Sequence, residues 1–383
     1  QYMTAWIQLL GAGQPQLAKQ YAIQAKFDEF TLKVSALQLD AVPPNGRFLS
    51  FGDNDFFPLL ALQLQQQYRT DVSIVHYQLL NAPWYFSLMK DSLGVSFPNE
   101  QLGQLRKGYL ILEGNPDSIR SRVCGSAEIV RIPTLKTGMS RYLLRNQLIL
   151  QKLIEQSRPD QPLCLSWYGD FELFSYLSNY LEVNGLAYEL TTSPRRHGQQ
   201  DLMMQQYGYL NLDSTSLAIQ SLLDSDWSWL KDDWDVNRSN QQFGSAIIRF
   251  WITSMYHHSL LLNNVASETE EDTERRDQLV FWARALEALF DEPKVILAES
   301  AAEMAIIGYR SNMEWMGEEW EKRMYACLDE VNWDELSRKD LEVRRGLLAL
   351  EVMGYYFQES GRDVQRITLE QELGKYEARL TDY

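Results

Sequence analysis

The sequence predicts an α/β domain followed by an all-helical region. Between about residues 37 and 200, apolar runs of four to six residues alternate with helical patterns, which is typical of strands joined by crossover helices. After about residue 201 the strand signals stop and apolar residues recur only at helical spacing. A chain of 383 residues is long enough for two or three domains of ordinary size.

The first 36 residues precede the α/β pattern and read as a helical hairpin. Apolar residues such as Trp6, Leu9 and Leu10, and later Ala18 and Tyr21, recur every three or four positions on either side of a break at 11–13. The turn-rich segment Val-Pro-Pro-Asn-Gly then leads into the first apolar run. We therefore expect residues 1–36 to form an N-terminal hairpin ahead of the sheet.

Residues 37–200 are expected to form a mostly parallel sheet. The expected strands are 47–51, 72–76, 109–112, 128–131, 162–166 and 186–190, and the expected helices are 56–68, 83–92, 139–157 and 171–183. Strands spaced by crossover helices favour a Rossmann-like arrangement, in which ligands bind beyond the carboxyl ends of the strands. The glycine-rich motifs that cradle dinucleotides and nucleotides are absent from the sequence.

Residues 201–383 are expected to form an irregular, TPR-like helical array. The expected helices are 239–262, 273–290, 295–309, 313–331 and 341–358. No clean 34-residue repeat runs through them, so any repeat packing must be degenerate.

Composition excludes several classes of function. A net charge of −16 repels phosphate backbones and argues against nucleic-acid binding. No window holds the roughly 18 apolar residues that a membrane span needs. Three widely spaced cysteines form neither a disulfide framework nor a zinc motif. No motif indicates a cofactor, a metal site or a complete catalytic set.

The sharpest local pattern is Phe-Gly-Asp-Asn-Asp-Phe-Phe-Pro-Leu at 51–59, between the first expected strand and its helix. Asp53, Asn54 and Asp55 can project into the crevice above the sheet and hold a hydroxylated ligand, a cation or a peptide. Alternatively, Asp55 can cap the helix by accepting a backbone N–H, while Gly52 permits the tight exit from the strand. Both interpretations fit the pattern.

Four blocks carry a resemblance to a known family. They are Gly-Asp-Asn-Asp at 52–55, Phe-Pro-Leu at 57–59, Arg-Thr-Asp-Val at 69–72 and Leu-Leu-Asn-Ala-Pro-Trp-Tyr at 79–85. With weaker blocks at 180–190 and 229–238, they resemble the soluble extracytoplasmic region of bacterial multi-span, protein O-mannosyltransferase-like membrane proteins. The resemblance covers roughly residues 40–260. The chain departs from the family at Phe56, Leu60 and Ala61 and lacks its membrane spans.

The resemblance implies a function without catalysis in this chain, because the family's catalytic acid lies in a loop between membrane spans. We expect a periplasmic or otherwise extracytoplasmic accessory domain that engages a protein or glycan partner at the strand-end crevice. The expected binding residues are Gly52, Asp53, Asn54, Asp55, Asn81, Trp84 and Tyr85. Two alternatives stay open: a soluble enzyme acting on a sugar or sugar nucleotide with Asp53 or Asp55 as base or cation ligand, and a structural adaptor of an envelope assembly that uses the helical array.

Other patterns have ordinary structural interpretations. Tryptophans 227, 229 and 234 lie among acids and resemble a sugar-binding surface, but Trp227, Leu230 and Trp234 recur at i, i+3 and i+7, which also fits a buried helix stripe. Adjacent histidines at 257 and 258 point about 100° apart on a helix and do not share a metal. The acidic run at 267–274 suits a solvated helix start, and the basic loop at 194–198 suits an exposed turn.

Overall fold

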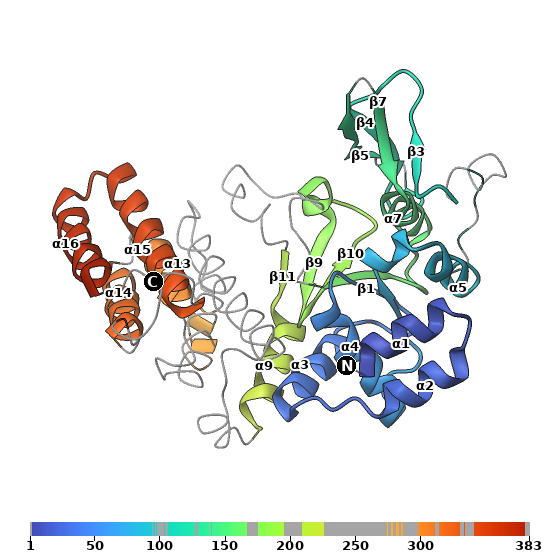
Figure 1. Cartoon of the computed structure of the whole chain (residues 1–383), viewed down its shortest axis with the longest axis horizontal. Helices are drawn as coiled ribbons and strands as arrows, with labels where there is room; N and C mark the ends of the chain where they lie inside the picture. The colour runs from blue at the N-terminus through green and yellow to red at the C-terminus, as the bar shows by residue number, and fades with distance from the viewer. Residues whose placement is uncertain are drawn as a thin grey trace. The chain divides into compact units, whose positions relative to one another are not determined.

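Figure 1 shows a computed structural model of the chain. The structure describes residues 2–93, 95, 97, 103, 106–126, 129–138, 140–166, 175–194, 209–225, 274, 277–278, 281–282, 285, 298–310, 314–329, 333 and 341–379. The chain divides into two compact units. Unit 1 comprises Gln1–Ser225 with Ser239–Ile247, and unit 2 comprises Asp226–Arg238 with Ile248–Tyr383.

Unit 1 is built on a mixed sheet of six strands in the order β11-β9-β10-β8-β1-β2. The strands are β1 (Arg47–Ser50), β2 (Ser73–His76), β8 (Leu163–Ser166), β9 (Leu181–Asn184), β10 (Ala187–Leu190) and β11 (Tyr209–Asn211). Strand β1 runs parallel to β2 and β8, as expected, and β11 runs parallel to β9. Strand β10 is antiparallel to both of its neighbours, so the sheet is only partly parallel.

The reversal of β10 has a local cause. A two-residue loop, Gly185 and Leu186, joins β9 to β10, and Gly185 has a positive φ of 53°. Loops this short join only antiparallel strands. The helix expected at 171–183 is therefore wrong for its described part, where a 3₁₀ helix, η3 (Ser175–Tyr180), leads directly into β9.

Helices α1 (Tyr2–Gly11) and α2 (Pro15–Ile23) pack against each other, and together with α3 (Glu29–Asp40) and α4 (Asp53–Gln66) they share a core with the sheet. The ring of Trp6 lies 5.8 Å from that of Phe56 and 6.3 Å from that of Phe57. The same core contains Phe48, Ile74 and Cys164 from three adjacent strands. The N-terminal hairpin thus contributes apolar side chains to the core of the α/β region.

Smaller β structures stand apart from the main sheet. Strands β3 (Tyr109–Ile111), β7 (Ser140–Leu144) and β6 (Leu135–Thr137) form one sheet, and β4 (Ser118–Arg122) pairs with β5 (Ile129–Pro133). In Figure 1 this arm is drawn in green and teal above the main sheet. The expectation that 109–112 and 128–131 extend the main sheet is therefore wrong. The helix expected from 139 begins only at Arg145, because the preceding residues pair as β7.

The remaining described elements of unit 1 are η1 (Gln78–Asn81), α5 (Pro83–Leu93), α7 (Arg145–Gln156) and α9 (Leu212–Leu223). Helix α7 buries one apolar face, which includes Leu148, Leu153 and Ile154, and η1 contacts both α5 and α7. Helix α9 contacts α3 and β9.

The described elements of unit 2 are α13 (Ala298–Arg310), α14 (Glu314–Asp329), α15 (Leu341–Glu359) and α16 (Asp363–Arg379). Helices α13 and α14 approach closely at Gly308 and Gly317, where a Cβ added to Gly308 would lie 2.5 Å from the backbone nitrogen of Gly317. Trp333 is fully buried and its Nε1 donates to the carbonyl of Leu328. The first three helices match expected ones, whereas α16 was not expected.

All three cysteines are free thiols: Cys164 and Cys327 are buried, and Cys124 is half-buried. Within the described ranges, no helix combines the length and apolarity that a bilayer crossing requires. The expected helix at 239–262 lies outside the described residues, and only scattered positions of 273–290 are described.

Candidate binding site at the carboxyl edge of the sheet

The carboxyl ends of β1, β2 and β8 meet at one edge of the main sheet, which we call the carboxyl edge. The chain passes from β1 through α4 to β2 on one side and later places β8 on the other side of β1. Such a reversal is a topological switch point, where open α/β sheets form their ligand crevices. The segment that follows β1, Phe51 to Asp55, lies at this point.

Asp55 stabilises the turn from β1 into α4. It is fully buried, and its two carboxylate oxygens accept the backbone N–H groups of Phe51 at 3.0 Å and Gly52 at 2.8 Å. The hydroxyl of Ser166, at the end of β8, also hydrogen-bonds the carboxylate and so links β8 to this turn. Burial raises the pKa of Asp55 to about 6 despite these hydrogen bonds. The capping interpretation of Asp55 therefore agrees with its geometry.

Asp53 has a different environment, although it lies only two residues away. Its side chain is 65% exposed, and its Oδ1 lies 3.1 Å from Nε2 of His76. Its other oxygen, Oδ2, makes no hydrogen bond with the part of the chain that the structure describes. Gly52 begins the turn with extended backbone at φ −149°, and Asn54 is half-buried beside Asp53.

His76 is the last residue of β2 and is buried. Its Nδ1 accepts the backbone N–H of Leu79 at 3.3 Å, which assigns the ring proton to Nε2, so Nε2 donates to Asp53. Burial lowers the pKa of His76, and this effect outweighs the hydrogen bond to Asp53. The ring of Phe56 packs edge-on against the imidazole at 5.0 Å. A neutral, fixed imidazole thus holds one oxygen of an exposed carboxylate.

The second predicted block begins near the same edge but turns inward. Tyr85 is buried, and its hydroxyl accepts the backbone N–H of His76 at 3.0 Å. Asn81 supports α7: its backbone carbonyl accepts from Arg145, and its side-chain oxygen accepts the N–H of Asn146 at 3.1 Å. Trp84 is half-buried against the end of α1, where a Cβ added to Gly11 would lie 3.4 Å from its Nε1.

Asp53 and Tyr85 therefore both contact His76 of β2, with Asn54 next to Asp53 in the chain, while Asn81 and Trp84 contact other helices. The sequence reasoning did not single out His76. The sequence does contain a signal for it, namely a histidine at the carboxyl end of the second expected strand. Because the ends of adjacent parallel strands lie at the same edge, this histidine is expected near the acidic turn that follows the first strand. The predicted block around Arg69 and Asp71 lies in a separate cluster.

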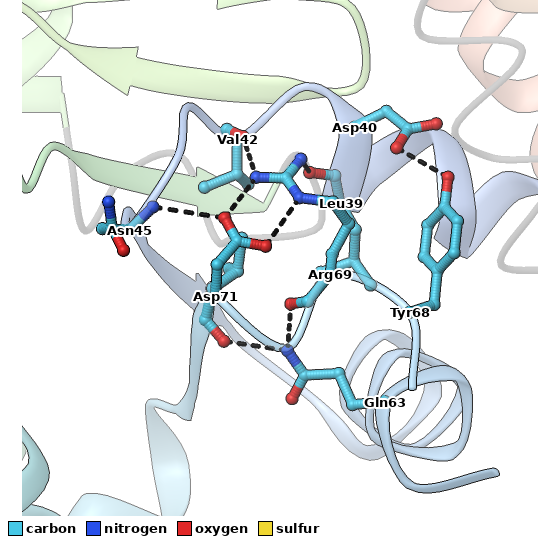
Figure 2. Close-up of polar contacts among 9 residues, drawn as sticks. Leu39, Asp40, Val42, Asn45, Gln63, Tyr68, Arg69 and Asp71 are labelled. Carbon is cyan, nitrogen blue, oxygen red and sulfur yellow. Dashed lines mark hydrogen bonds and ion pairs between the residues drawn. The ribbon is translucent and has the colours of Figure 1, made fainter. Parts of the chain in front are cut away.

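That second cluster, drawn in Figure 2, fixes the segment between α4 and β2. The guanidinium of Arg69 pairs with both carboxylate oxygens of Asp71 at 2.9 Å and donates to the carbonyls of Leu39 at 2.6 Å and Val42 at 2.8 Å. It therefore places a cation at the carbonyl end of α3, where the helix dipole favours one. Arg69 holds the pKa of Asp71 near 2.

Beside this cluster, a groove of about 560 Å³ opens between the end of α3 and α9. It is lined by Leu37, Asp40, Ala41, Val42, Pro43, Pro44, Arg69, Asp71, Asn184, Gly185, Glu189, Ser214, Leu217, Ala218 and Ser221. Its polar groups bond to one another: the amide of Asn184 donates to Glu189 at 2.6 Å, and Ser214 donates to Asn184 at 3.1 Å. Burial raises the pKa of Glu189.

Among the described residues, no group of three or more His, Cys, Asp or Glu side chains could hold a metal ion. The tryptophans at 227, 229 and 234, the histidine pair at 257 and 258 and the basic residues at 195–197 lie outside the described residues. So does the acidic run at 267–274 apart from its last residue.

Part of the chain is similar to a known family. The family model TMEM260-associated domain 2 matches residues 32–107, a stretch that holds most of α3, the Arg69 cluster, the acidic turn and His76. No curated protein and no solved structure matches the chain. The matched stretch also contains the four sequence blocks at 52–85 that carry the resemblance described above.

Proposed function

We propose that unit 1 is a non-catalytic binding domain that engages a protein or glycan partner at the carboxyl edge. One observation carries the proposal: the exposed carboxylate of Asp53 is fixed by buried His76 through Oδ1, while Oδ2 makes no hydrogen bond with a described residue. A carboxylate oxygen fixed in this way accepts hydrogen bonds from hydroxyl or amide donors without reorganising.

The hydrogen bonds that the groups around Asp53 already make favour binding over catalysis. Both nitrogens of His76 are engaged within the chain, so the imidazole does not act as a base toward a ligand. Asp55 is committed to the turn. Asp53 alone of these three offers a carboxylate to an incoming group, which suits recognition better than acid and base catalysis.

The finer parts of the proposal rest on the sequence resemblance. We propose that the sheet is a Rossmann-like variant carrying a reversed β10, and that unit 2 is a TPR-like helical array. We further propose that the chain works on the extracytoplasmic side, in the periplasm or its equivalent, as an accessory domain of a protein-glycosylating membrane enzyme. The agreement in order and spacing of the blocks at 52–85 supports the statements on the sheet and on the accessory role, and the contacts among α13, α14, α15 and α16 support the helical array.

A second candidate, an adaptor role for unit 2, is favoured by an exposed apolar stripe on α15. Leu348, Val352 and Tyr355 are 42%, 36% and 66% exposed and recur at i, i+4 and i+7, so they share one face of the helix. If unit 2 has that role, charged substitutions on this stripe should abolish assembly of the protein with its envelope partner, even when the carboxyl edge is intact.

The primary test compares Asp53→Asn with a matched control, Asp160→Asn. Asp160 is another exposed aspartate of unit 1, paired with Arg158 at 3.4 Å. Wild type and both variants are applied to an array of neutral oligosaccharides and peptides, and incubated with a panel of sugar-nucleotide donors. We expect array binding that Asp53→Asn reduces about tenfold and Asp160→Asn leaves unchanged, with no donor turnover.

Two outcomes contradict the proposal. If a donor is turned over and the turnover depends on Asp53, the protein is an enzyme. If all three proteins bind the array equally, the carboxyl edge does not take part in recognition. The compartment is tested separately by fractionating cells that make the native, untagged protein. Recovery in the cytoplasmic fraction alone contradicts the extracytoplasmic placement.

A further inference from the structure

The hairpin formed by β4 and β5 carries a cationic face. Arg120, Arg122 and Arg131 are exposed, and all three project from the same side of the hairpin because exposure alternates along both strands. Arg120 lies directly opposite Arg131 in the strand register, and Arg122 lies opposite Ile129, which is 42% exposed. We call these four residues the arginine face.

The arginine face has no internal counterion in the described part of the chain. None of its three guanidinium groups makes an ion pair there, whereas Arg141 in the neighbouring sheet pairs with Asp117. Like charges directly opposite each other on paired strands are destabilising, so the arrangement costs stability in the free protein. An anionic ligand would reverse that cost.

The surrounding sequence has the opposite charge balance to the rest of the protein. Residues 106–145 contain eight Lys and Arg against three Asp and Glu, although the whole chain carries a net charge of −16. Cationic groups concentrated on one arm of an acidic protein attract anions locally and leave most of the other surface repulsive to them.

A hollow of about 400 Å³ lies against this face and is lined by Arg120, Ser121, Arg122, Gly125, Ile129 and Glu155. Glu155 is the one acidic residue of the lining, and its charge is already balanced. Its Oε2 accepts from Lys152 at 2.8 Å, and its Oε1 accepts from Gln151 at 2.9 Å and Ser121 at 3.3 Å. The hollow therefore keeps the positive potential of its arginines.

We propose that the arginine face is a binding site for a phosphate-bearing anion, namely a phosphate monoester or pyrophosphate group. Guanidinium groups bind phosphate oxygens through paired hydrogen bonds. Three of them match the double charge and several oxygens of a phosphate dianion better than the single charge and two oxygens of a carboxylate. This site is separate from the carboxyl edge and does not depend on the proposed function.

The experiment measures pyrophosphate binding by calorimetry on the full chain at low and moderate salt. The double variant Arg120→Gln/Arg131→Gln is compared with Arg158→Gln, which removes an exposed arginine already paired with Asp160. We expect the double variant to lose at least tenfold in affinity and the control to match wild type. Wild-type binding should also weaken as salt rises. The double variant should unfold at or above the wild-type temperature, because it removes a repulsion, and the control should unfold close to it, because an exposed ion pair contributes little stability.

A second arm distinguishes the source of the phosphate. Flotation with phosphatidylcholine vesicles, with and without phosphatidic acid, whose headgroup is a phosphate monoester, reports a lipid headgroup if binding needs both the anionic lipid and the arginines. Pyrophosphate binding without vesicle binding indicates a free phosphorylated ligand. The proposal is overturned if wild type and the double variant bind pyrophosphate equally or not at all, or if poly-glutamate binds the arginines more tightly than pyrophosphate does, which would indicate an acidic protein partner.

Discussion

The Arg69 cluster and the Asp53–His76 pair of the carboxyl edge lie in the same matched stretch of sequence, and both contain an aspartate beside a basic side chain. In the first, Arg69 bonds to Asp71 and two backbone carbonyls, while Gln63 donates to the carbonyls of Arg69 and Val72 at 2.8 Å (Figure 2). In the second, His76 uses both of its nitrogens, but Oδ2 of Asp53 has no hydrogen-bond partner among the described residues. One cluster is closed and the other is open.

The difference separates stabilising charges from charges that are available for binding. A closed network loses several hydrogen bonds at once when one member is removed, and the partners stay behind without compensation. An open, exposed carboxylate loses little stability on removal, because water already solvates it. Four substitutions test whether stabilising charges and charges available for binding can be separated in this way, and the first has the largest expected effect.

Replacing Arg69 with Met should destabilise unit 1 by about 3 kcal/mol, because the carbonyls at the end of α3 and the carboxylate of Asp71 lose their charged donor. Urea unfolding of the variant and of the control Arg158→Met measures the difference. Arg69→Lys should recover only part of the loss, since an ammonium group cannot reproduce the paired geometry. A loss of stability below about 1 kcal/mol would contradict the stabilising role of the Arg69 cluster.

Replacing Asp55 with Asn should cost about 2 kcal/mol, since an amide offers one acceptor where the carboxylate serves two backbone donors. The change also has a pH signature. Burial raises the folded-state pKa of Asp55 from 3.8 to about 6, so its contribution to stability is present below pH 4 and is lost as pH rises to about 6. Unfolding curves between pH 4 and 7 should show this slope in wild type and not in the variant.

Replacing His76 with Gln should cost about 1 to 2 kcal/mol and remove a slope of the opposite sign. The folded-state pKa of His76 lies below its ordinary 6.5, so its contribution is present above pH 6.5 and is lost as pH falls through the folded value. Parallel curves for wild type and variant between pH 5 and 7 would contradict the neutral, buried imidazole.

Replacing Asp53 with Asn should change the stability of unit 1 by less than about 0.5 kcal/mol, because the side chain is exposed and keeps an oxygen that can accept from His76. Thermal unfolding beside Asp160→Asn measures the change. A loss of stability as large as that of Asp55→Asn would show that Asp53 stabilises the fold, and the basis for its recognition role would be lost.

The parts of the fold that sequence predicted best are those with a local cause. Buried apolar runs identified β1, β2, β8 and β10, and the acidic turn identified the start of α4. The direction of β10 was missed although Asn184-Gly185 is a strong hairpin signal. The apolar spacing at 171–183, which favours a helix running up to this point, obscures that signal. Strand β7 was missed because its five residues continue into α7 without a break in apolar spacing.

The candidate site was less predictable, because it depends on contacts between distant residues. Asp53 and Asp55 have the same chemistry in the sequence, and their different partners, Ser166 of β8 for Asp55 and His76 of β2 for Asp53, come from distant strands. His76 lies 23 residues from its partner, and no local pattern joins the two. The inward orientation of Tyr85 likewise follows from how α5 packs against β2.

The three free thiols supply a way to follow each unit separately. Cys164 lies in the central sheet of unit 1 and Cys327 lies inside unit 2, while Cys124 is half-buried. Burial raises the pKa of Cys164 well above its ordinary value, and only thiolates react with alkylating reagents at an appreciable rate. Alkylation at Cys164 therefore reports opening of the sheet, and alkylation at Cys327 reports opening of the helical unit. Mass spectrometry of labelled peptides reads both events in one sample, which reveals whether the two units unfold together or one at a time.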